Sequence, residues 1–325
     1  MPVPYMGSKR GSASKIISVI KAYYPNASDL YDVFCGGFAI SEEALKRGYN
    51  VYASDLNASI VNLIHEVLYG ECTDEKTGKS IFEYPRFITR KEFYDYANKD
   101  DWFAGYIKCV WSFGNNNKGY LYSPDNETLK LEAHNLVVEG KISDDLPVPK
   151  IIQKKVAKYK TYQGRRKALG YYARANCTEY RNIELERLRS LENLQHLRSL
   201  ENLQRLRSLE NLQHLRSLEN LQHLRSLENL SYDQVKVRPG AIVYCDPPYI
   251  GTAEYVANDT QFDHNKFYAW ARNLSQTNPV FISEYHCPSD FKCIYEFERR
   301  QLLSKGNTKY NEKLYLLDNT KKEAA

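Results

Sequence analysis

The sequence predicts an α/β protein with a mostly parallel sheet, into which a second domain and a leucine-rich repeat are inserted. Three observations lead to this prediction. An apolar run at Leu30–Phe34 is followed by a Gly-Gly turn and a helical pattern. More strand-forming runs lie near the other end of the chain, and the segment between has a different composition. These later expected strands are Ala241–Cys245, Val280–Ser283, Cys293–Phe297 and Lys313–Leu317.

The first expected unit is a strand, a glycine turn and a helix. The apolar run at Leu30–Phe34 leads into Gly36 and Gly37, and a helical pattern follows and ends near Arg47. This order is typical of the first half of a mononucleotide-binding unit, where small residues let a ligand approach the backbone closely. The pattern therefore indicates a ligand site at the glycine turn.

A second expected strand, Val51–Ser54, ends in an acid, Asp55. Asp55 follows the glycines by about twenty residues, where an acid can bond both ribose hydroxyls of an adenosine moiety. A helical stretch also begins at Asn57, so Asp55 could instead cap that helix. The spacing supports both interpretations equally.

The tetrapeptide Asp246-Pro247-Pro248-Tyr249 follows the expected buried strand at Ala241–Cys245. The two prolines fix the backbone and remove two amide donors, which leaves nearby carbonyls free to accept hydrogen bonds. A planar amino group would fit between two such acceptors, with the tyrosine against its ring. A stiff turn without further function is the alternative.

Several motifs occur in a fixed order along the chain. They are Tyr5-Met6-Gly7-Ser8-Lys9, Asp32-Val33-Phe34-Cys35-Gly36-Gly37, Asp55, Asp246-Pro247-Pro248-Tyr249, Gly251–Tyr255, Phe281–Tyr285 and Glu312–Leu314. This order resembles that of the Dam-type (alpha group) DNA adenine methyltransferases, particularly phage and prophage members. The resemblance covers most of the chain outside residues 185 to 230. It implies a class I, Rossmann-like methyltransferase fold and methyl transfer from S-adenosylmethionine to the N6 amine of adenine in DNA.

The resemblance also implies a set of cofactor contacts, because the family's first motif and glycine turn bind S-adenosylmethionine. The residues at matching positions are Tyr5, Lys9, Asp32, Phe34, Gly36, Asp55, Ser231 and Tyr232. Ser231 to Asp233 are expected to start the strand and turn that meet the cofactor's adenine. One position departs from the family, because Phe38 replaces the last glycine of the Phe-x-Gly-x-Gly pattern, so its side chain must point away from the cofactor.

Methyl transfer from a sulfonium needs no metal, because the leaving group is already activated and the protein mainly positions the nucleophile. We expect Asp246 and the carbonyl of Pro247 to accept the two amino hydrogens, and Tyr249 to stack on the base. The base must first be flipped out, at a cost of roughly a few kcal/mol. Tyr255 is a candidate second wall or an ordinary loop aromatic. A cytosine N4 amine is an alternative target, because the tetrapeptide does not separate the two amines.

Residues 68 to 184 are expected to form the target-recognition insertion. Within it, Trp111–Tyr122 places asparagines and a lysine between glycines, which suits a loop or hairpin that offers amides to base edges. The candidate DNA contacts there are Asn115, Asn116 and Lys118, and a plain asparagine-rich turn is the alternative. The expected partner is double-stranded DNA.

A basic cluster follows within the same segment, interleaved with tyrosines. Its basic members are Lys154, Lys155, Lys158, Lys160, Arg165, Arg166 and Lys167. The chain's net charge of +5 is only mildly basic, so this local clustering carries the prediction of phosphate contact. A solvated helix face is the usual alternative for such a run.

A nine-residue unit, Leu-Arg-Ser-Leu-Glu-Asn-Leu-Gln-His, recurs between residues 185 and 230, with leucine at every third position. In an α-helix these leucines would spread around the axis. A 3₁₀ helix of this length is uncommon, and a solenoid is a third choice. The sequence does not decide between them. A tolerated spacer is our main interpretation, and a surface for a partner or for self-association is the alternative.

The expected organisation has four segments: a cofactor-binding half at 1–67, the recognition insertion at 68–184, the repeat at 185–230 and the second catalytic half at 231–325. Seven cysteines without Cys-x-x-Cys spacing favour reduced thiols and no metal site. No signal peptide is visible, and no apolar run approaches the roughly 20 residues that span a bilayer, so we expect a cytoplasmic protein. A DNA-binding or assembly protein that acts through the repeat is the rival from another class.

Overall fold

The chain forms two compact units in a computed structural model. The structure describes residues 3–5, 7–113, 118–146, 148–175, 204–218, 220–250, 262–300 and 309–319. The first unit comprises Met1–Tyr69, Asp100–Gly105 and His214–Ala325, and the second comprises Gly70–Lys99 and Tyr106–Gln213. The predicted boundaries 1–67, 68–184, 185–230 and 231–325 differ from this division mainly in the repeat, which contributes residues to both units.

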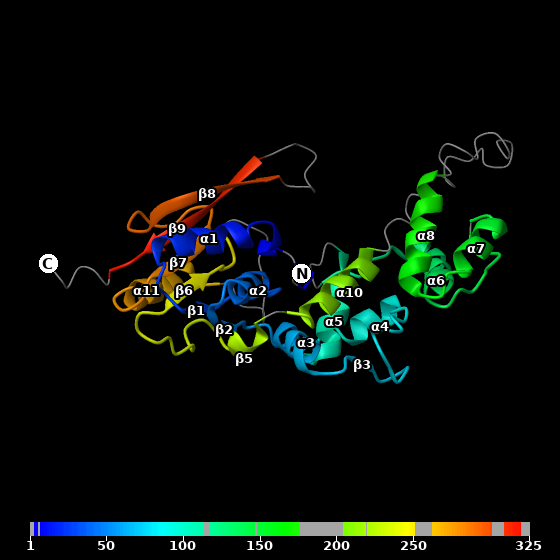
Figure 1. The fold of residues 1–325 in the computed structure, drawn as a ribbon, viewed down its shortest axis with the longest axis horizontal. Coiled ribbons are helices and arrows are strands. Elements are labelled where there is room, and N and C mark those ends of the chain that lie inside the picture. Colours follow the sequence, from blue (N-terminus) through cyan, green and yellow to red (C-terminus); the bar gives the residue numbers. More distant parts are fainter. Residues whose placement is uncertain are drawn as a thin grey trace. The chain divides into compact units, whose positions relative to one another are not determined.

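The first unit is built on a seven-stranded sheet with the order β5-β2-β1-β6-β7-β9-β8 (Figure 1). Its strands are β1 (Asp29–Asp32), β2 (Asn50–Ser54), β5 (Leu224–Glu228), β6 (Ile242–Cys245), β7 (Val280–Glu284), β8 (Lys292–Arg300) and β9 (Lys309–Leu317). The strands from β5 to β7 in this order are parallel, and β9 pairs antiparallel with both β7 and β8. The prediction of a mostly parallel sheet built from both ends of the chain is confirmed.

Helices of the first unit alternate with the strands as in an α/β fold. They are α1 (Ala13–Tyr23), α2 (Ala39–Lys46), α3 (Ala58–Tyr69) and α11 (His264–Leu274), with short 3₁₀ turns η1 (Lys9–Gly11) and η4 (Leu221–His223). In α1, Ile16, Ile17 and Ile20 recur at helical spacing and are fully buried. Burial of each such side chain stabilises the fold by about 1.5–3 kcal/mol. At the start of α11, the carboxylate of Asp263 accepts a hydrogen bond from the backbone N–H of Lys266, which caps the helix.

Strand β6 lies at the centre of the sheet, between β1 and β7. Its four residues are all buried, and the apolar run in the sequence follows from this position because both faces of a central parallel strand are covered. The tetrapeptide that begins at Asp246 comes directly after this strand. A central strand that is buried along its whole length therefore presents the predicted catalytic residues.

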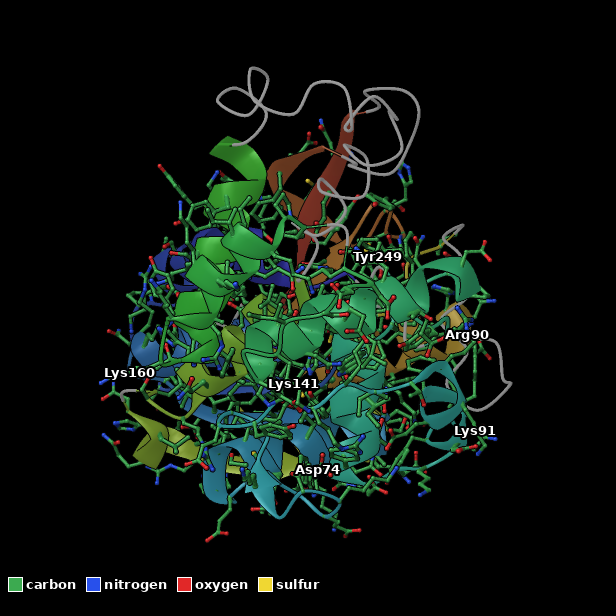
Figure 2. The ribbon with its side chains drawn as sticks, turned by 90° about the vertical axis from the view of Figure 1, so that its right-hand side faces the viewer. Asp74, Arg90, Lys91, Lys141, Lys160 and Tyr249 are labelled. Atoms are coloured by element: carbon green, nitrogen blue, oxygen red, sulfur yellow. The ribbon has the colours of Figure 1, made fainter. Side chains whose placement is uncertain are left out.

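The second unit is mainly helical. Its elements are the hairpin β3 (Thr73–Asp74) and β4 (Lys79–Ser80), α4 (Arg90–Asp95), α6 (Pro124–Val138), α7 (Lys150–Ala157), α8 (Tyr162–Ala175) and most of α10 (Gln204–Leu215), while α5 (Trp102–Val110) begins in the first unit. Arg86 forms ion pairs with Asp74, labelled in Figure 2, and with Glu92. These pairs tie the hairpin to α4.

The repeat adopts two conformations in its described copies. Helix α10 contains one copy and buries Leu206, Leu209, Leu212 and Leu215, since successive leucines drift by only about 60° and the helix is short. The last copy, from Leu224, instead forms edge strand β5. The expectation that Ser231 starts a strand is wrong, because residues 232 to 234 form a turn and the strand precedes them. The last copy of the repeat is thus part of the seven-stranded sheet, and residues 185–203 lie outside the described residues.

Candidate active site

Four acids meet at one edge of the sheet in the first unit. Asp32 ends β1, Asp55 follows β2, Asp246 follows β6 and Glu284 ends β7. The carboxyl ends of parallel strands share one edge, which is where ligands bind in open α/β sheets. The structure therefore brings together Asp32, Asp55 and Asp246, which the sequence predicted from distant motifs, and adds Glu284, which was not among the predicted site residues.

The glycine turn after β1 is closely packed against the beginning of the chain. A Cβ atom added to Gly37 would lie 2.6 Å from the carbonyl oxygen of Val3, so only glycine fits there. The ring of Tyr5 lies against Gly36, whose φ is +42°. Phe38 has a φ of +70°, the left-handed conformation that glycine adopts without strain, and its side chain is fully buried. Phe38 thus keeps the backbone of the glycine that it replaces.

Asp55 connects the glycine turn to the next helix. Its carboxylate accepts hydrogen bonds from the backbone N–H of Gly36 (2.8 Å) and of Asn57 (2.9 Å). Burial raises the pKa of Asp55, and the two N–H groups lower it in part. Asp55 is not the N-cap of α3, because the helix begins at Ala58 and the side chain of Asn57 accepts from the N–H of Ile60 in its first turn. Asp55 instead joins the glycine turn to the residue before the helix. Its contact with a cofactor stays a prediction.

Asp32 is almost completely buried, and only one of its two carboxylate oxygens has a hydrogen-bond partner among the described residues. One carboxylate oxygen, Oδ2, accepts a hydrogen bond from the hydroxyl of Ser41 at 2.7 Å. The other, Oδ1, has no hydrogen-bond partner among the described residues. Burial, and secondarily the negative charges of Asp246 and Asp55, raise the pKa of Asp32 to about 7. A buried oxygen in this environment favours a cationic or hydrogen-bond-donating ligand.

Lys9 contacts two residues of the tetrapeptide, Asp246 and Tyr249. Its ammonium nitrogen is 2.6 Å from Oδ1 of Asp246 and 3.3 Å from Oε1 of Glu312. The same nitrogen is 4.8 Å from the centre of the Tyr249 ring, and the Tyr249 hydroxyl donates to Glu312 at 2.8 Å. Lys9, which the resemblance assigned to the cofactor, therefore contacts the predicted catalytic residues directly.

The role of Glu312 in this cluster was missed from the sequence. The residue lies on β9, which belongs to the far end of the chain and contributes Leu314 and Leu317 to the core. Glu312 is 1% exposed. An acid at a buried position of a strand is unusual unless it is paired, and this is the signal that could have identified it.

Two side chains hold the tetrapeptide loop in place. Glu284 accepts hydrogen bonds from the backbone N–H groups of Ile250 (2.7 Å) and Tyr285. His264 donates from Nε2 to the carbonyl of Pro248 at 2.8 Å. The carbonyl of Pro247 receives no hydrogen bond from any described residue. The loop is therefore anchored at Pro248 and Ile250, directly after an available acceptor.

An aromatic cluster surrounds the other predicted cofactor residues. The rings of Phe34 and Tyr232 stack with centroids 5.4 Å apart, and Phe262 and Phe267 pack against them. Ser231 precedes Tyr232 and donates its N–H to the side chain of Gln234. The structure thus joins Phe34 from the first motif to Tyr232 from the segment after the repeat.

The predicted DNA contacts differ in what surrounds them. Lys118, Lys154 and Lys155 are exposed, as is Lys160, labelled in Figure 2. Arg165 instead donates to the carbonyl groups of four residues. The guanidinium of Arg166 pairs with Glu210 at 2.6 Å. Asn115, Asn116 and Tyr255 lie outside the described residues.

The cysteines of the described part, Cys35, Cys72, Cys109, Cys245, Cys287 and Cys293, are all free thiols. Within the same residues, no group of three or more histidine, cysteine or acidic side chains could hold a metal ion. A helix with the length and apolarity of a membrane span is likewise absent from the part that the structure describes.

Comparison with known families agrees with this geometry. The family model described as D12 class N6 adenine-specific DNA methyltransferase matches residues 5–300. The match includes the glycine turn and the tetrapeptide, and ends before Glu312. A search of curated proteins found no significant match.

Proposed function

Because this chain belongs to the D12 class N6 adenine-specific DNA methyltransferases, we propose that it transfers the methyl group at the cluster formed by Asp246, Pro247 and Tyr249. The observation that carries this proposal is the pair of acceptors after β6. The carboxylate of Asp246 lies next to the Pro247 carbonyl, which has no hydrogen-bond partner among the described residues. An exocyclic amine has two hydrogens to donate, and the pair matches them.

These two acceptors would activate the amine. The lone pair of an aromatic amine is delocalised into the ring, so the nitrogen is a poor nucleophile. Hydrogen bonds from its two hydrogens to Asp246 and to the Pro247 carbonyl would draw it toward tetrahedral geometry and free the lone pair. Both acceptors are preorganised, since β6 and the bonds at Pro248 and Ile250 hold the loop.

S-adenosylmethionine is the cofactor that we assign to the neighbouring residues, and it supplies a methyl group that is already activated for displacement. The unsatisfied oxygen of Asp32 suits the positive charge of this molecule. The closely packed turn at Gly36 and Gly37 would hold the backbone near the ligand. Tyr5, Asp55 and the aromatic pair of Phe34 and Tyr232 would complete the site, with Ser231 beside them.

Tyr249 would receive the flipped base. Its hydroxyl is bonded to Glu312, and its ring packs edge to face on Tyr285 at 4.8 Å, so the ring is held in one orientation. Stacking on such a ring returns about 1–3 kcal/mol per base, which offsets part of the cost of flipping. Double-stranded DNA is the partner in this proposal. The exposed Lys118, Lys154 and Lys155 of the second unit are the candidates for phosphate contact.

Transfer of a tritiated methyl group to DNA, followed by nucleoside analysis, tests the proposal. We expect N6-methyladenine from the wild type and no product from Asp246→Ala. Asp290→Ala is the control, because Asp290 is an acid in an exposed ion pair with Arg272 on the same unit, and it should retain full activity. Methylcytosine as the product, or an active Asp246→Ala variant, would contradict the proposal.

A further inference from the structure

The ammonium of Lys9 has two carboxylates within reach. It contacts Asp246 at 2.6 Å and Glu312 at 3.3 Å, and Lys9 is 5% exposed. One cation thus lies between two anions in a largely buried place. The shorter contact uses Oδ1 of Asp246, an oxygen of the carboxylate that the target amine has to reach.

We propose that Glu312 is a positioning residue that holds Lys9 when the target amine binds Asp246. This inference rests on the proposed function of Asp246. Before the base enters, Lys9 neutralises Asp246 and fixes its carboxylate. When the amine donates to Asp246, the ammonium moves toward Glu312, which lies only slightly farther away. A buried ammonium that lost its contact with Asp246 and had no second carboxylate would carry a large desolvation cost.

Glu312 also holds the ring of Tyr249, on which the base would stack. The hydroxyl of Tyr249 donates to Oε1 of Glu312, the same oxygen that lies nearest to Lys9. The orientation of the Tyr249 ring and the position of the ammonium therefore share one acceptor. A shift of Lys9 toward Glu312 would therefore change the hydrogen bond that orients the Tyr249 ring, against which the base stacks.

The buried acid at this position is paired with residues of the site. A buried strand residue without polar neighbours is normally apolar, because an unpaired charge in the interior is costly. Lys9 and Tyr249, the partners described above, both belong to the site. The position of Glu312 is thus coupled to residues that act on the base.

The test uses Glu312→Gln, which keeps the shape of the side chain and removes its charge. The rate is measured on a duplex that contains the site methylated by the wild type. Base flipping is measured on a second duplex, in which 2-aminopurine replaces the target adenine and reports by fluorescence without being methylated. We expect kcat to fall about 10- to 100-fold, the loss that follows from weakening one charged hydrogen-bond network. KM for S-adenosylmethionine should stay within about twofold, because the cofactor residues are unchanged. The 2-aminopurine signal of the flipped base should also change, which a purely structural role would not produce.

Tyr249→Phe provides a second, milder variant, since it removes only the hydroxyl that donates to Glu312. We expect its kcat to fall about 3- to 10-fold, the cost of one neutral hydrogen bond. Combined with Glu312→Gln, its effect should be smaller than the product of the two single effects, because one change weakens and the other removes the same contact. Glu296→Gln is the matched control: Glu296 lies on the neighbouring strand β8 and pairs with Lys313 outside the site, so this variant should behave as the wild type.

An unchanged kcat in Glu312→Gln, or in Tyr249→Phe if the first variant does not fold, would overturn this inference. Fully multiplicative effects in the double variant would overturn it as well. These outcomes can be distinguished from a failure of the proposed function. If Asp246→Ala is inactive while Glu312→Gln is fully active, the proposed function stands and only the role of Glu312 is lost.

Discussion

Asp32 is a residue whose charge should respond to the binding of a cationic ligand. Its pKa is raised to about 7 by burial and by two neighbouring acids, so a large fraction of the protein carries this carboxyl protonated near neutral pH. The folded pKa lies above the ordinary value of 3.8. Its contribution to stability is therefore fully present below pH 4 and is lost as the pH rises through about 7.

A cationic cofactor should reverse this preference, because positive charge near Asp32 favours its ionised form. We predict that S-adenosylmethionine binds more tightly as the pH rises from 6 to 8 and that binding releases protons near pH 7. Calorimetry in two buffers of different ionisation enthalpy measures that release. Asp32→Asn should abolish the release and weaken binding, and a proton release that persists in this variant would contradict the assignment of Asp32.

Gly37 shows how little space the turn has. Gly37→Ala would place a Cβ atom 2.6 Å from the backbone oxygen of Val3, which cannot rotate away. We expect the free energy of unfolding to fall by about 1–3 kcal/mol, as for other overpacked sites, and cofactor affinity to fall with it. Thermal unfolding checks the first effect. Gly11→Ala is the control, since its Cβ would meet nothing within 4 Å, and equal losses in both variants would show that close packing at Gly37 is not the cause.

The common position of three acids could be inferred from motifs in the sequence, while their roles stay predictions. Asp246 and Asp55 follow strand-forming runs and Asp32 lies within one, so the parallel arrangement of the strands places them at one edge. Glu312 could not be assigned this way. Its role depends on the pairing of β9 with β7, which brings the far end of the chain to the tetrapeptide, and no local pattern near Glu312 encodes that pairing.

At the level of elements, the repeat shows that one sequence can form two structures. Leu-Arg-Ser-Leu-Glu-Asn-Leu is helical at 206–212, whereas its first five residues form strand β5 at 224–228. Local propensity is the same in both copies, so tertiary contacts decide. For β5 these include the Asn229 side chain, which donates to the carbonyls of Asp55 and Leu56. This is why periodicity alone could not assign a conformation to the repeat.

Because the copies are nearly identical, the chain should tolerate loss of a whole copy. Deletion of 206–214 leaves β5 unchanged and moves the preceding copy into the place of α10. Each buried leucine and the partner of Arg166 are then replaced by the same residue type. We expect the free energy of unfolding to stay within about 0.5 kcal/mol of the wild type, and methylation activity to be kept. Chemical denaturation measures the first quantity.

A deletion that breaks the nine-residue period serves as the control. Removal of 206–210 would put Gln204 and Glu201 into the buried positions of Leu209 and Leu206. Burial of these polar groups should cost about 3 kcal/mol or more. If the nine-residue deletion is as harmful as this one, the copies are not interchangeable.

At the level of the whole molecule, we propose that methyl transfer takes place on the first unit, and that the helical second unit, which carries the clustered lysines, contacts DNA. We predict that the double variant Lys154→Gln and Lys155→Gln weakens DNA binding and lowers the slope of log affinity against log salt by about 2. The rate at saturating DNA should be unchanged. Fluorescence anisotropy at several salt concentrations measures the slope.

Lys91→Gln is the matched control for this variant. Lys91 is exposed on α4 and pairs with Asp95, outside the basic cluster. Equal changes of slope in both variants would contradict the assignment of Lys154 and Lys155. Arg165 and Arg166 are expected to act differently, because their guanidinium groups bond protein groups and their loss should lower stability first.

The single-turnover rate of methyl transfer in Asp246→Asn tests the central claim most directly. Asparagine keeps the size of the side chain but replaces a carboxylate oxygen by a donor, which would oppose the amino group. With DNA and cofactor saturating, the account predicts that the rate falls about 10²- to 10³-fold, as on removal of a preorganised catalytic hydrogen-bonding group, while cofactor affinity is kept. A variant that methylates adenine at the wild-type rate would contradict it.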